Sequence, residues 1–405
     1  MKILPMVCVM TVAALAVPAH AQVAAAISGK VEDASGAAVR QATVTVKSLE
    51  TGATRVVTTD EVGNYRALSL GIGPHEVRAS KTGFKTQIRS RINLEVGQDA
   101  VVNLRLEVGE IAQEVTVSDE TAVVNVTTSS VAGMVGEREV KDLPLNGRSF
   151  DNLITLNPGA INYGLKSANT STSNGNTFSV AGRRPMDNLV LLNGIEYSGG
   201  SQLAITPGGV SGNLLGIDAV REFNLQTDTY GAEYGKRSGG QVSVVTQSGT
   251  NAVHGSLFEF LRNSSLDSRS VFAQTPHVPP FRQNQFGGAL GGPLKKDRLF
   301  LFGNYEGFRQ AQTLSSVSVV PDAQVRQGAF PNAAGVYTPV SGLNRSMLAY
   351  FSFWPQPNGP ELLSNGLPSG TAFSYNNPKQ TIREDFATVR SDYTIRDRDT
   401  LSAVE

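Results

Sequence analysis

Side chains that commonly do chemistry in proteins are sparse in this sequence. Outside the first 21 residues, histidine stands at His75, His254 and His277. A zinc peptidase site needs two histidines and a glutamate, with H-x-x-E as its local core, and none of the three histidines begins that pattern. His75 falls in the middle of a predicted strand, where we expect it at the surface rather than on a metal. The histidines therefore predict no zinc centre.

The single cysteine and the paired glycines offer no other centre. Cys8 lies in an N-terminal apolar segment, so removal of that segment would leave no thiol, disulfide or Cys-type metal site. The glycine pairs at 287–288 and 291–292 lack the Lys-Ser/Thr and the helix of a nucleotide loop. The formal net charge is zero, which gives no electrostatic case for nucleic-acid binding. We expect a protein that is not an enzyme and uses no cofactor or metal.

The N-terminal segment has the features of a secretory leader. Lys2 precedes an apolar run over residues 3–17, and Ala19 and Ala21 form an A-x-A cleavage signature after Pro18. This predicts a signal peptide over residues 1–21, with a buried N-terminal helix as the alternative, and places the chain in the bacterial envelope. No later run is long and apolar enough for a membrane-spanning helix. This does not exclude a membrane β-barrel, because the sequence pattern of each barrel strand is much weaker than that of a membrane helix.

Residues 22–108 have the pattern of a small antiparallel β-sandwich, in which short alternating segments are separated by glycines. The expected strands are Ile27–Asp33, Ala42–Lys47, Thr54–Thr58, Asn64–Ser69, His75–Ala79, Thr86–Asn93 and Ala100–Leu106. The stretch Thr59–Phe84 resembles the carboxypeptidase regulatory-like domain, which implies a carbohydrate-binding-like fold. Sugar binding follows only by analogy with that fold. The two aromatics that could stack on a sugar, Tyr65 and Phe84, are expected in the core.

Residues 139–249 carry four motifs in order. They are D-L-P-L-N-G-R (142–148), V-A-G-R-R-P-M-D-N-L-V-L-L-N-G-I-E (180–196), I-D-A-V-R-E-F-N-L (217–225) and Y-G-A-E-Y-G-K-R-S-G-G-Q-V-S-V-V-T-Q-S-G (230–249). This order resembles the α+β plug domain of TonB-dependent outer-membrane receptors, in their Oar-like branch. Locally, the sequence predicts a helix capped by Ser149, a buried strand over Leu189–Leu192 and a hairpin turn at Asn193-Gly194.

The plug resemblance implies a role for charged residues in this region. A plug lies inside a barrel with a polar interior, so its charged groups can pair with the wall, whereas on a soluble domain they would face solvent. The residues expected to make plug–barrel contacts are Arg148, Arg183, Arg184, Glu222 and Glu233.

Residues 109–138 form a connector that contains a β-prone peptide. Its core, E-V-T-V-S at 114–118, resembles the TonB box, a segment that adds as a strand to a sheet edge of the energy-coupling partner. An ordinary strand of the sandwich or of the plug is the alternative. The residues proposed to bind a TonB-type energy-coupling protein are Gln113, Glu114, Val115, Thr116, Val117 and Ser118.

Residues 250–405 predict the start of an antiparallel outer-membrane β-barrel. Strands are expected at 251–262, 283–294, 298–309 and 385–396, with a short charged turn at 292–298 and long polar loops at 266–282 and 310–379. In the last strand, Val389, Tyr393 and Ile395 fall on one face, and Arg390 and Asp392 fall on the other. A barrel strand needs this pattern, with apolar side chains facing lipid and polar side chains facing the lumen. The sequence contains about four or five expected barrel strands, whereas receptors of the family that it resembles close their barrel with about 22. This difference predicts a fragment or a truncated gene product.

The resemblances together imply a mainly β receptor of the cell outer membrane, with its sandwich in the periplasm. We expect it to contact outer-membrane lipid and to import a ligand such as an oligosaccharide, a peptide or a metal chelate, which the sequence does not identify. A structural or adhesive envelope protein and a carbohydrate-binding envelope module are the alternatives.

Overall fold

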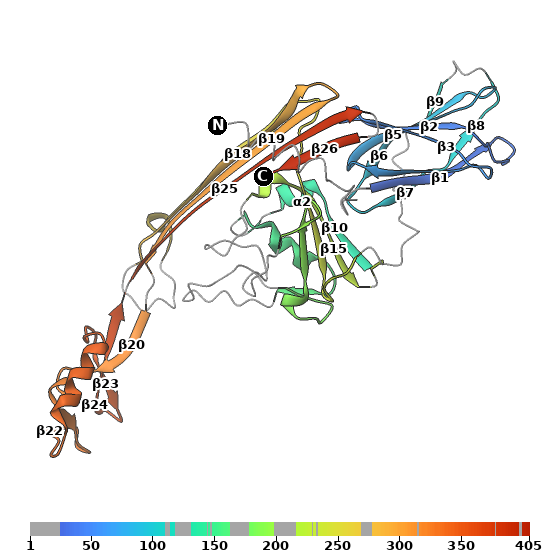
Figure 1. The fold of residues 1–405 in the computed structure, drawn as a ribbon. Helices are drawn as coiled ribbons and strands as arrows, with labels where there is room; N and C mark the ends of the chain where they lie inside the picture. Colours follow the sequence, from blue (N-terminus) through green and yellow to red (C-terminus); the bar gives the residue numbers. More distant parts are fainter. Residues whose placement is uncertain are drawn as a thin grey trace, which may run out of the picture. The chain divides into compact units, whose positions relative to one another are not determined.

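The computed structural model describes residues 25–109, 114–117, 131–143, 145, 148–162, 178–197, 216–228, 230–231, 234–268, 278–313, 316–376, 378–396 and 399–405. The predicted signal peptide lies outside these ranges. The fold is mainly β, as the sequence predicts (Figure 1). Among the described residues no helix is long and apolar enough to cross a membrane. The chain divides into two compact units. The first unit comprises Met1–Phe258, Gly287–Glu306 and Asp385–Glu405, and the second unit comprises Glu259–Phe286 and Gly307–Glu384.

The N-terminal part of the first unit is a sandwich of two sheets. One sheet has the order β4-β1-β7, with β8 also paired to β1, and the other has the order β3-β2-β5-β6-β9. Strict alternation builds the core, because every second side chain of a strand such as β5 is buried. The strands are β1 (Ala25–Asp33), β2 (Thr43–Ser48), β3 (Thr54–Thr58), β4 (Asn64–Leu70), β5 (Gly73–Ser80), β6 (Thr86–Leu94), β7 (Asp99–Val101), β8 (Leu104–Leu106) and β9 (Glu114–Val117).

The two aromatics of the sandwich lie where the sequence places them. Tyr65 is buried in the core, and its hydroxyl donates a hydrogen bond of 2.6 Å to the carbonyl of Val102. Phe84 is partly buried against the same cluster. A stacking surface for sugar therefore gains no support from these two rings.

Residues 131–249 include the stretch predicted to be a plug and are called the plug region, or plug, below. They contain a further, mixed sheet with the order β10-β15-β16-β13-β14. Its core includes Phe150, Phe223 and Leu225. Asn193 and Gly194 have φ angles of +50° and +84° and join β13 to β14 in a two-residue turn, which confirms the predicted hairpin. The elements are β10 (Val131–Val135), α2 (Glu137–Asp142), the 3-10 helix η2 (Phe150–Leu156), β11 (Ala160–Asn162), β12 (Phe178–Val180), η3 (Pro185–Asp187), β13 (Leu189–Leu192), β14 (Ile195–Glu196), η4 (Ile217–Ala219), β15 (Val220–Asp228) and β16 (Gln241–Thr246).

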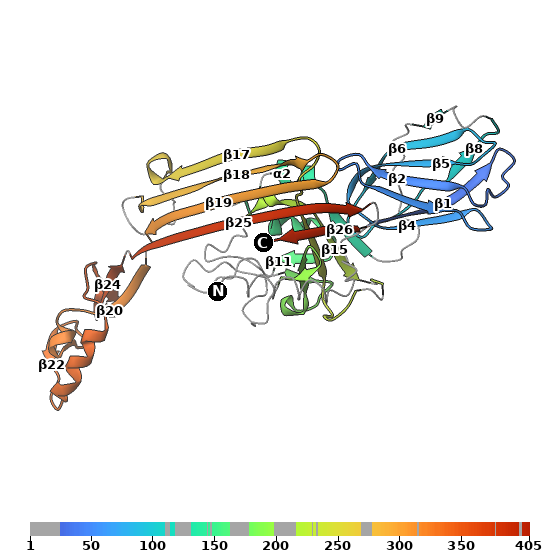
Figure 2. The ribbon, with the colours of Figure 1, turned by 45° about the horizontal axis from the view of Figure 1, so that its top comes forward.

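The remaining long strands form one sheet with the order β17-β18-β19-β25-β26, which Figure 2 shows side by side. In β25 the apolar side chains Val389, Tyr393 and Ile395 are 50%, 40% and 49% exposed, while Thr388 and Asp392 are buried. The strand is therefore apolar outside and polar inside, as the sequence predicts. The strands are β17 (His254–Asn263), β18 (Phe281–Lys295), β19 (Leu299–Thr313), β25 (Lys379–Arg396) and β26 (Asp399–Val404).

The stretch 310–379, predicted as a long polar loop, is instead largely folded. Its apolar residues alternate where β20 pairs with β24, and Val320 and Ala372 are buried there. Burial of these side chains supplies the local core that a structureless loop lacks. The elements are β20 (Ser316–Pro321), η6 (Val325–Gln327), β21 (Ala329–Pro331), β22 (Tyr337–Pro339), η7 (Arg345–Phe353), β23 (Glu361–Ser364) and β24 (Leu367–Asn376).

Candidate functional site

The segment at the start of η4 contacts the long strands. The backbone N–H of Gly216 donates a hydrogen bond of 2.7 Å to the carboxylate of Glu306, a fully buried residue of β19. Gly216 has a φ of +88°, and a Cβ at this position would overlap the ring of Phe386 in β25. Only glycine fits both the backbone angle and the close approach of the ring.

Arg148 and Asp218, both outside the long strands, join the same segment to β17. Arg148 pairs with Asp218 of η4, and its guanidinium lies 3.8 Å from the ring centroid of Phe258 in β17. The second oxygen of Asp218 accepts a hydrogen bond of 2.9 Å from Ser256, also in β17. Asp218 therefore connects Arg148 with Ser256 of β17, and the cation–π contact adds to the attachment.

The end of β16 is tied to β25 by a polar group. The guanidinium of Arg390 donates to the backbone carbonyl of Thr246 at 2.9 Å. Arg390 also pairs with Asp392 at 2.9 Å, and Asp392 accepts from Ser402 of β26 at 2.6 Å. The buried strand β16 is thus anchored to a charged pair on the polar face of β25.

The same end of this sheet, where Glu222 of β15 pairs with Val245 of β16, is attached to the sandwich through Arg221 and Glu222. Arg221 forms a bidentate pair with Glu50, which follows β2. Glu222 accepts a hydrogen bond of 2.6 Å from the backbone N–H of Val96. Burial raises the pKa of Glu222 to about 7, against the opposing effects of the Val96 N–H and Arg221.

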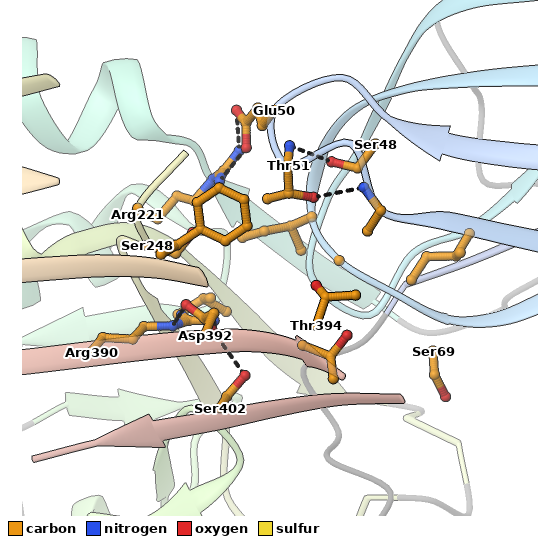
Figure 3. Close-up of a pocket in the computed structure, with 18 of the residues that line it drawn as sticks. Ser48, Glu50, Thr51, Ser69, Arg221, Ser248, Arg390, Asp392, Thr394 and Ser402 are labelled. Atoms are coloured by element: carbon orange, nitrogen blue, oxygen red, sulfur yellow. Dashed lines mark hydrogen bonds and ion pairs between the residues drawn. The ribbon is translucent and has the colours of Figure 1, made fainter. Parts of the chain in front are cut away.

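A cavity of about 440 Å³ lies at this junction. Figure 3 shows Glu50 and Arg221 on one side of it and Arg390, Asp392 and Ser402 on the other. His75 also lines the cavity and is only 2% exposed, so the prediction that it lies at the surface is wrong. Its ring nitrogen lies 2.8 Å from the carbonyl of Gly73, and burial lowers the pKa of this histidine.

The attachments described above are noncovalent and mainly polar. The contacts are hydrogen bonds, ion pairs and a ring contact between three parts of one unit. In the part of the chain that the structure describes, no group of three or more His, Cys, Asp or Glu side chains could hold a metal ion.

The predicted plug contacts have different surroundings. Arg148 contacts β17 as described above. Arg183 is exposed and lies 3.8 Å from Asp228 of the plug itself, and Arg184 is also exposed. Glu222 contacts the sandwich, and Glu233 lies outside the described residues.

The predicted partner-binding residues are described in part. Residues 114–117 form β9, whose backbone pairs with β6. Gln113 and Ser118 lie outside the described ranges. Whether the segment binds a partner stays a prediction.

Sequence reasoning missed several residues that make these contacts. They are Glu50, Gly216, Asp218, Arg221, Thr246, Ser256, Glu306, Phe386 and Arg390. A usable signal existed for some of them, because Arg390 stands on the polar face of an alternating strand. No local signal pairs Glu306 with Gly216, which precedes it by 90 positions.

Comparison with known proteins gives three findings. A family model described as an outer membrane beta barrel domain matches residues 245–404, and one described as a carboxypeptidase regulatory-like domain matches residues 26–107. The chain is 29% identical over 296 residues to the TonB-dependent transporter Oar of Myxococcus xanthus, covering 68% of this chain and 26% of that protein. It thus spans about a quarter of the length of that curated relative.

Two solved structures are similar over about two thirds of the chain. The ferric enterobactin receptor of Pseudomonas aeruginosa has a TM-score of 0.36 and 17% identity, over 68% of this chain and 32% of that one. The outer membrane transporter YddB of Escherichia coli has a TM-score of 0.39 and 14% identity, over 67% of this chain and 32% of that one.

Proposed function

We propose that this chain, an outer-membrane homologue of the TonB-dependent transporter Oar with a carboxypeptidase regulatory-like domain, acts as a receptor that imports a ligand. An energy-coupling protein of the TonB type pulls on the connector and displaces the plug. The ligand belongs to the class of oligosaccharides, peptides or metal chelates, and the sandwich works on the periplasmic side. The curated relative is a transporter, which fits a role without catalysis.

The observation that carries the proposal is the set of contacts around Gly216. The N–H of Gly216 and the carboxylate of Asp218 are held by Glu306 and Ser256, which belong to two different long strands. Among the described residues these contacts are hydrogen bonds and a cation–π contact, so a pull on the plug breaks polar contacts at this point. Such an attachment suits a part that must move and return.

The test is the reactivity of a cysteine buried beneath the plug attachment. Thr246 is 5% exposed under Arg390, and Val253, shortly after it, is 74% exposed. In growing cells, a maleimide should label Thr246→Cys several times faster than in cells treated with a protonophore. Val253→Cys should label at the same rate in both. All variants carry Cys8→Ala to remove the natural cysteine.

Deletion of residues 113–118 should abolish the energy-dependent labelling of Thr246→Cys. Equal labelling in energised and de-energised cells would argue against plug displacement and in favour of a structural or adhesive envelope protein, which needs no such movement.

A further inference from the structure

The turn between β2 and β3 of the sandwich, residues 49–53, is closed by its own hydrogen bonds. The N–H of Ser48 donates to the carbonyl of Ala53 at 2.8 Å. The N–H of Leu49 donates at 2.9 Å to the carbonyl of Pro74 in the neighbouring strand β5. These bonds hold the backbone of the turn on the sandwich, and Glu50 extends from it toward Arg221 (Figure 3).

Glu50 contacts two other parts of the first unit at once. Its carboxylate forms the bidentate pair with Arg221 of the plug strand β15. Its backbone carbonyl accepts a hydrogen bond of 2.9 Å from the N–H of Asn251, which lies in the short link between β16 and β17. One residue of the sandwich thus binds the plug and the chain that leads from the plug to the long strands.

The same turn of the sandwich also meets the turn between β18 and β19. Gly52 has a φ of +74°, and a Cβ there would lie 2.3 Å from Oδ1 of Asp297. Asp297 and Asn251 hold each other through two hydrogen bonds, of 2.8 Å from Asn251 Nδ2 to Asp297 Oδ1 and 2.9 Å from Asp297 N–H to Asn251 Oδ1. Glycine at 52 allows both the backbone angle and this close approach.

The sandwich and the plug have separate hydrophobic cores among the described residues. The sandwich cluster lies between Ala25 and Leu106, and the plug cluster lies between Val135 and Val244. The β2–β3 turn is therefore a polar attachment between parts that each pack around their own core. Such contacts fix a position, but water can replace them at modest net cost, so the attachment can open without unfolding either part.

We propose that the sandwich is a latch for the plug, in which the β2–β3 turn ties strand β15 to the long strands through Asn251 and Asp297. The plug leaves its place only after this turn has withdrawn. The inference rests on the proposed function in one respect, since a latch has a task only if the plug is displaced during uptake.

A disulfide tests the position of the turn in the full chain. A Cβ at residue 52 would lie 3.4 Å from the Cβ of Asp297, close to the separation that a disulfide needs. With Cys8→Ala present, Gly52→Cys/Asp297→Cys should oxidise to a cross-linked form in most molecules. Gly36→Cys/Asp297→Cys should not, because Gly36 has a similar φ of +87° but no atom within 4 Å of an added Cβ. Equal cross-linking in the two variants would overturn the latch.

The entry of vancomycin into cells tests whether the turn retains the plug. Glu50→Lys places a second positive charge against Arg221 and alters only the sandwich, so at normal abundance it should lower the vancomycin concentration that stops growth by roughly fourfold or more. Glu61→Lys makes the same charge change at an exposed sandwich position, where Glu61 pairs with Arg40, and should leave that concentration unchanged. Equal resistance of the two variants would overturn the latch.

The labelling of Thr246→Cys judges the proposed function separately, because it uses neither latch variant. If Thr246→Cys labels equally with and without energy while Glu50→Lys admits vancomycin, the proposed function fails and retention of the plug by the sandwich stands. If the labelling depends on energy while Glu50→Lys and Glu61→Lys are equally resistant, the latch fails and the proposed function stands.

Discussion

Arg221 of the plug and Glu50 of the sandwich form two parallel hydrogen bonds, of 2.8 Å between Nη1 and Oε2 and 2.9 Å between Nη2 and Oε1. Their side chains are 9% and 27% exposed. A bidentate pair of this kind fixes orientation as well as distance, because the guanidinium fork and the carboxylate share a plane. The pair thus connects a plug strand with the turn between β2 and β3 in a defined geometry.

Removal of both members of this pair should cost less stability than the two single removals added together. Arg221→Gln should lower the free energy of unfolding by about 2 kcal/mol, because Glu50 then keeps a partly buried charge without its partner. The double variant Glu50→Gln/Arg221→Gln should lose less free energy of unfolding than the sum of the losses in the two single variants. The measurement is a double-mutant cycle of thermal unfolding in detergent.

Arg40 and Glu61 provide the matched control. They form an ion pair in the same unit, but their side chains are 71% and 75% exposed. Arg40→Gln should change stability by no more than about 0.5 kcal/mol, as exposed pairs do. If Arg40→Gln and Arg221→Gln were equally mild, the junction would not depend on the Arg221–Glu50 pair.

Substitution of Gly216 separates a backbone effect from a packing effect. Gly216→Ala places a Cβ against Phe386 and also forces an alanine to a φ of +88°. Gly182→Ala meets a φ of +72° with no atom within 4 Å of the added Cβ. Gly182→Ala should therefore cost about 1 kcal/mol from strain alone, and Gly216→Ala clearly more.

The double variant Gly216→Ala/Phe386→Ala checks the cause of that difference. Removal of the Phe386 ring should restore part of the stability lost in Gly216→Ala, measured by thermal unfolding of the purified protein. An equal loss in Gly216→Ala and Gly182→Ala would mean that the ring is not close to the plug.

The sandwich and the plug turn were predictable because local patterns fix them. Strand β3 (Thr54–Thr58) has the predicted bounds, since alternation and flanking glycines specify a strand without reference to distant residues. The turn at Asn193-Gly194 needs two residues with positive φ, and this dipeptide is the usual solution. Both features depend on short-range backbone chemistry alone.

The site was less predictable because its contacts are long-range. Glu222 was expected against the barrel wall, yet the structure pairs it with the N–H of Val96 in the sandwich. The two residues are 126 positions apart, and no periodicity relates them. A charge in a plug motif indicates that a partner exists, while the tertiary fold decides which of several polar surfaces supplies it.

Loss of the Glu306 carboxylate should loosen the plug. Glu306 is fully buried and accepts the Gly216 N–H, and a hydrogen bond to a charged group contributes about 1.5–3 kcal/mol. Glu306→Ala should increase the entry of a large antibiotic such as vancomycin into cells. Glu306→Gln keeps an acceptor oxygen and should be milder.

Glu259→Gln, an exposed position on β17, serves as the control and should leave antibiotic entry unchanged. Wild-type resistance in Glu306→Ala cells that contain the protein at normal abundance would contradict a role for this carboxylate in holding the plug.

The carboxyl of Glu222 should make the stability of the junction depend on pH. Burial raises the pKa of Glu222 from 4.5 to about 7, so the folded protein holds a proton that the unfolded chain has released. The stability that this proton contributes is fully present below pH 4.5 and is lost as the pH rises through about 7. A shift of this size corresponds to at most roughly 3 kcal/mol.

Glu222→Gln isolates this contribution because its amide oxygen can still accept the Val96 N–H while the titration is removed. His75 acts in the opposite direction, since its lowered pKa costs stability as the pH falls, and Glu95, Glu137 and Arg221 also influence the site. These groups are present in both proteins, so the difference in melting temperature reports Glu222 alone. Relative to Glu222→Gln, the wild type should be most stable near pH 5 and lose that advantage by pH 8. A difference that stays constant from pH 5 to pH 8 would show that Glu222 is ionised throughout and that its burial is relieved in solution.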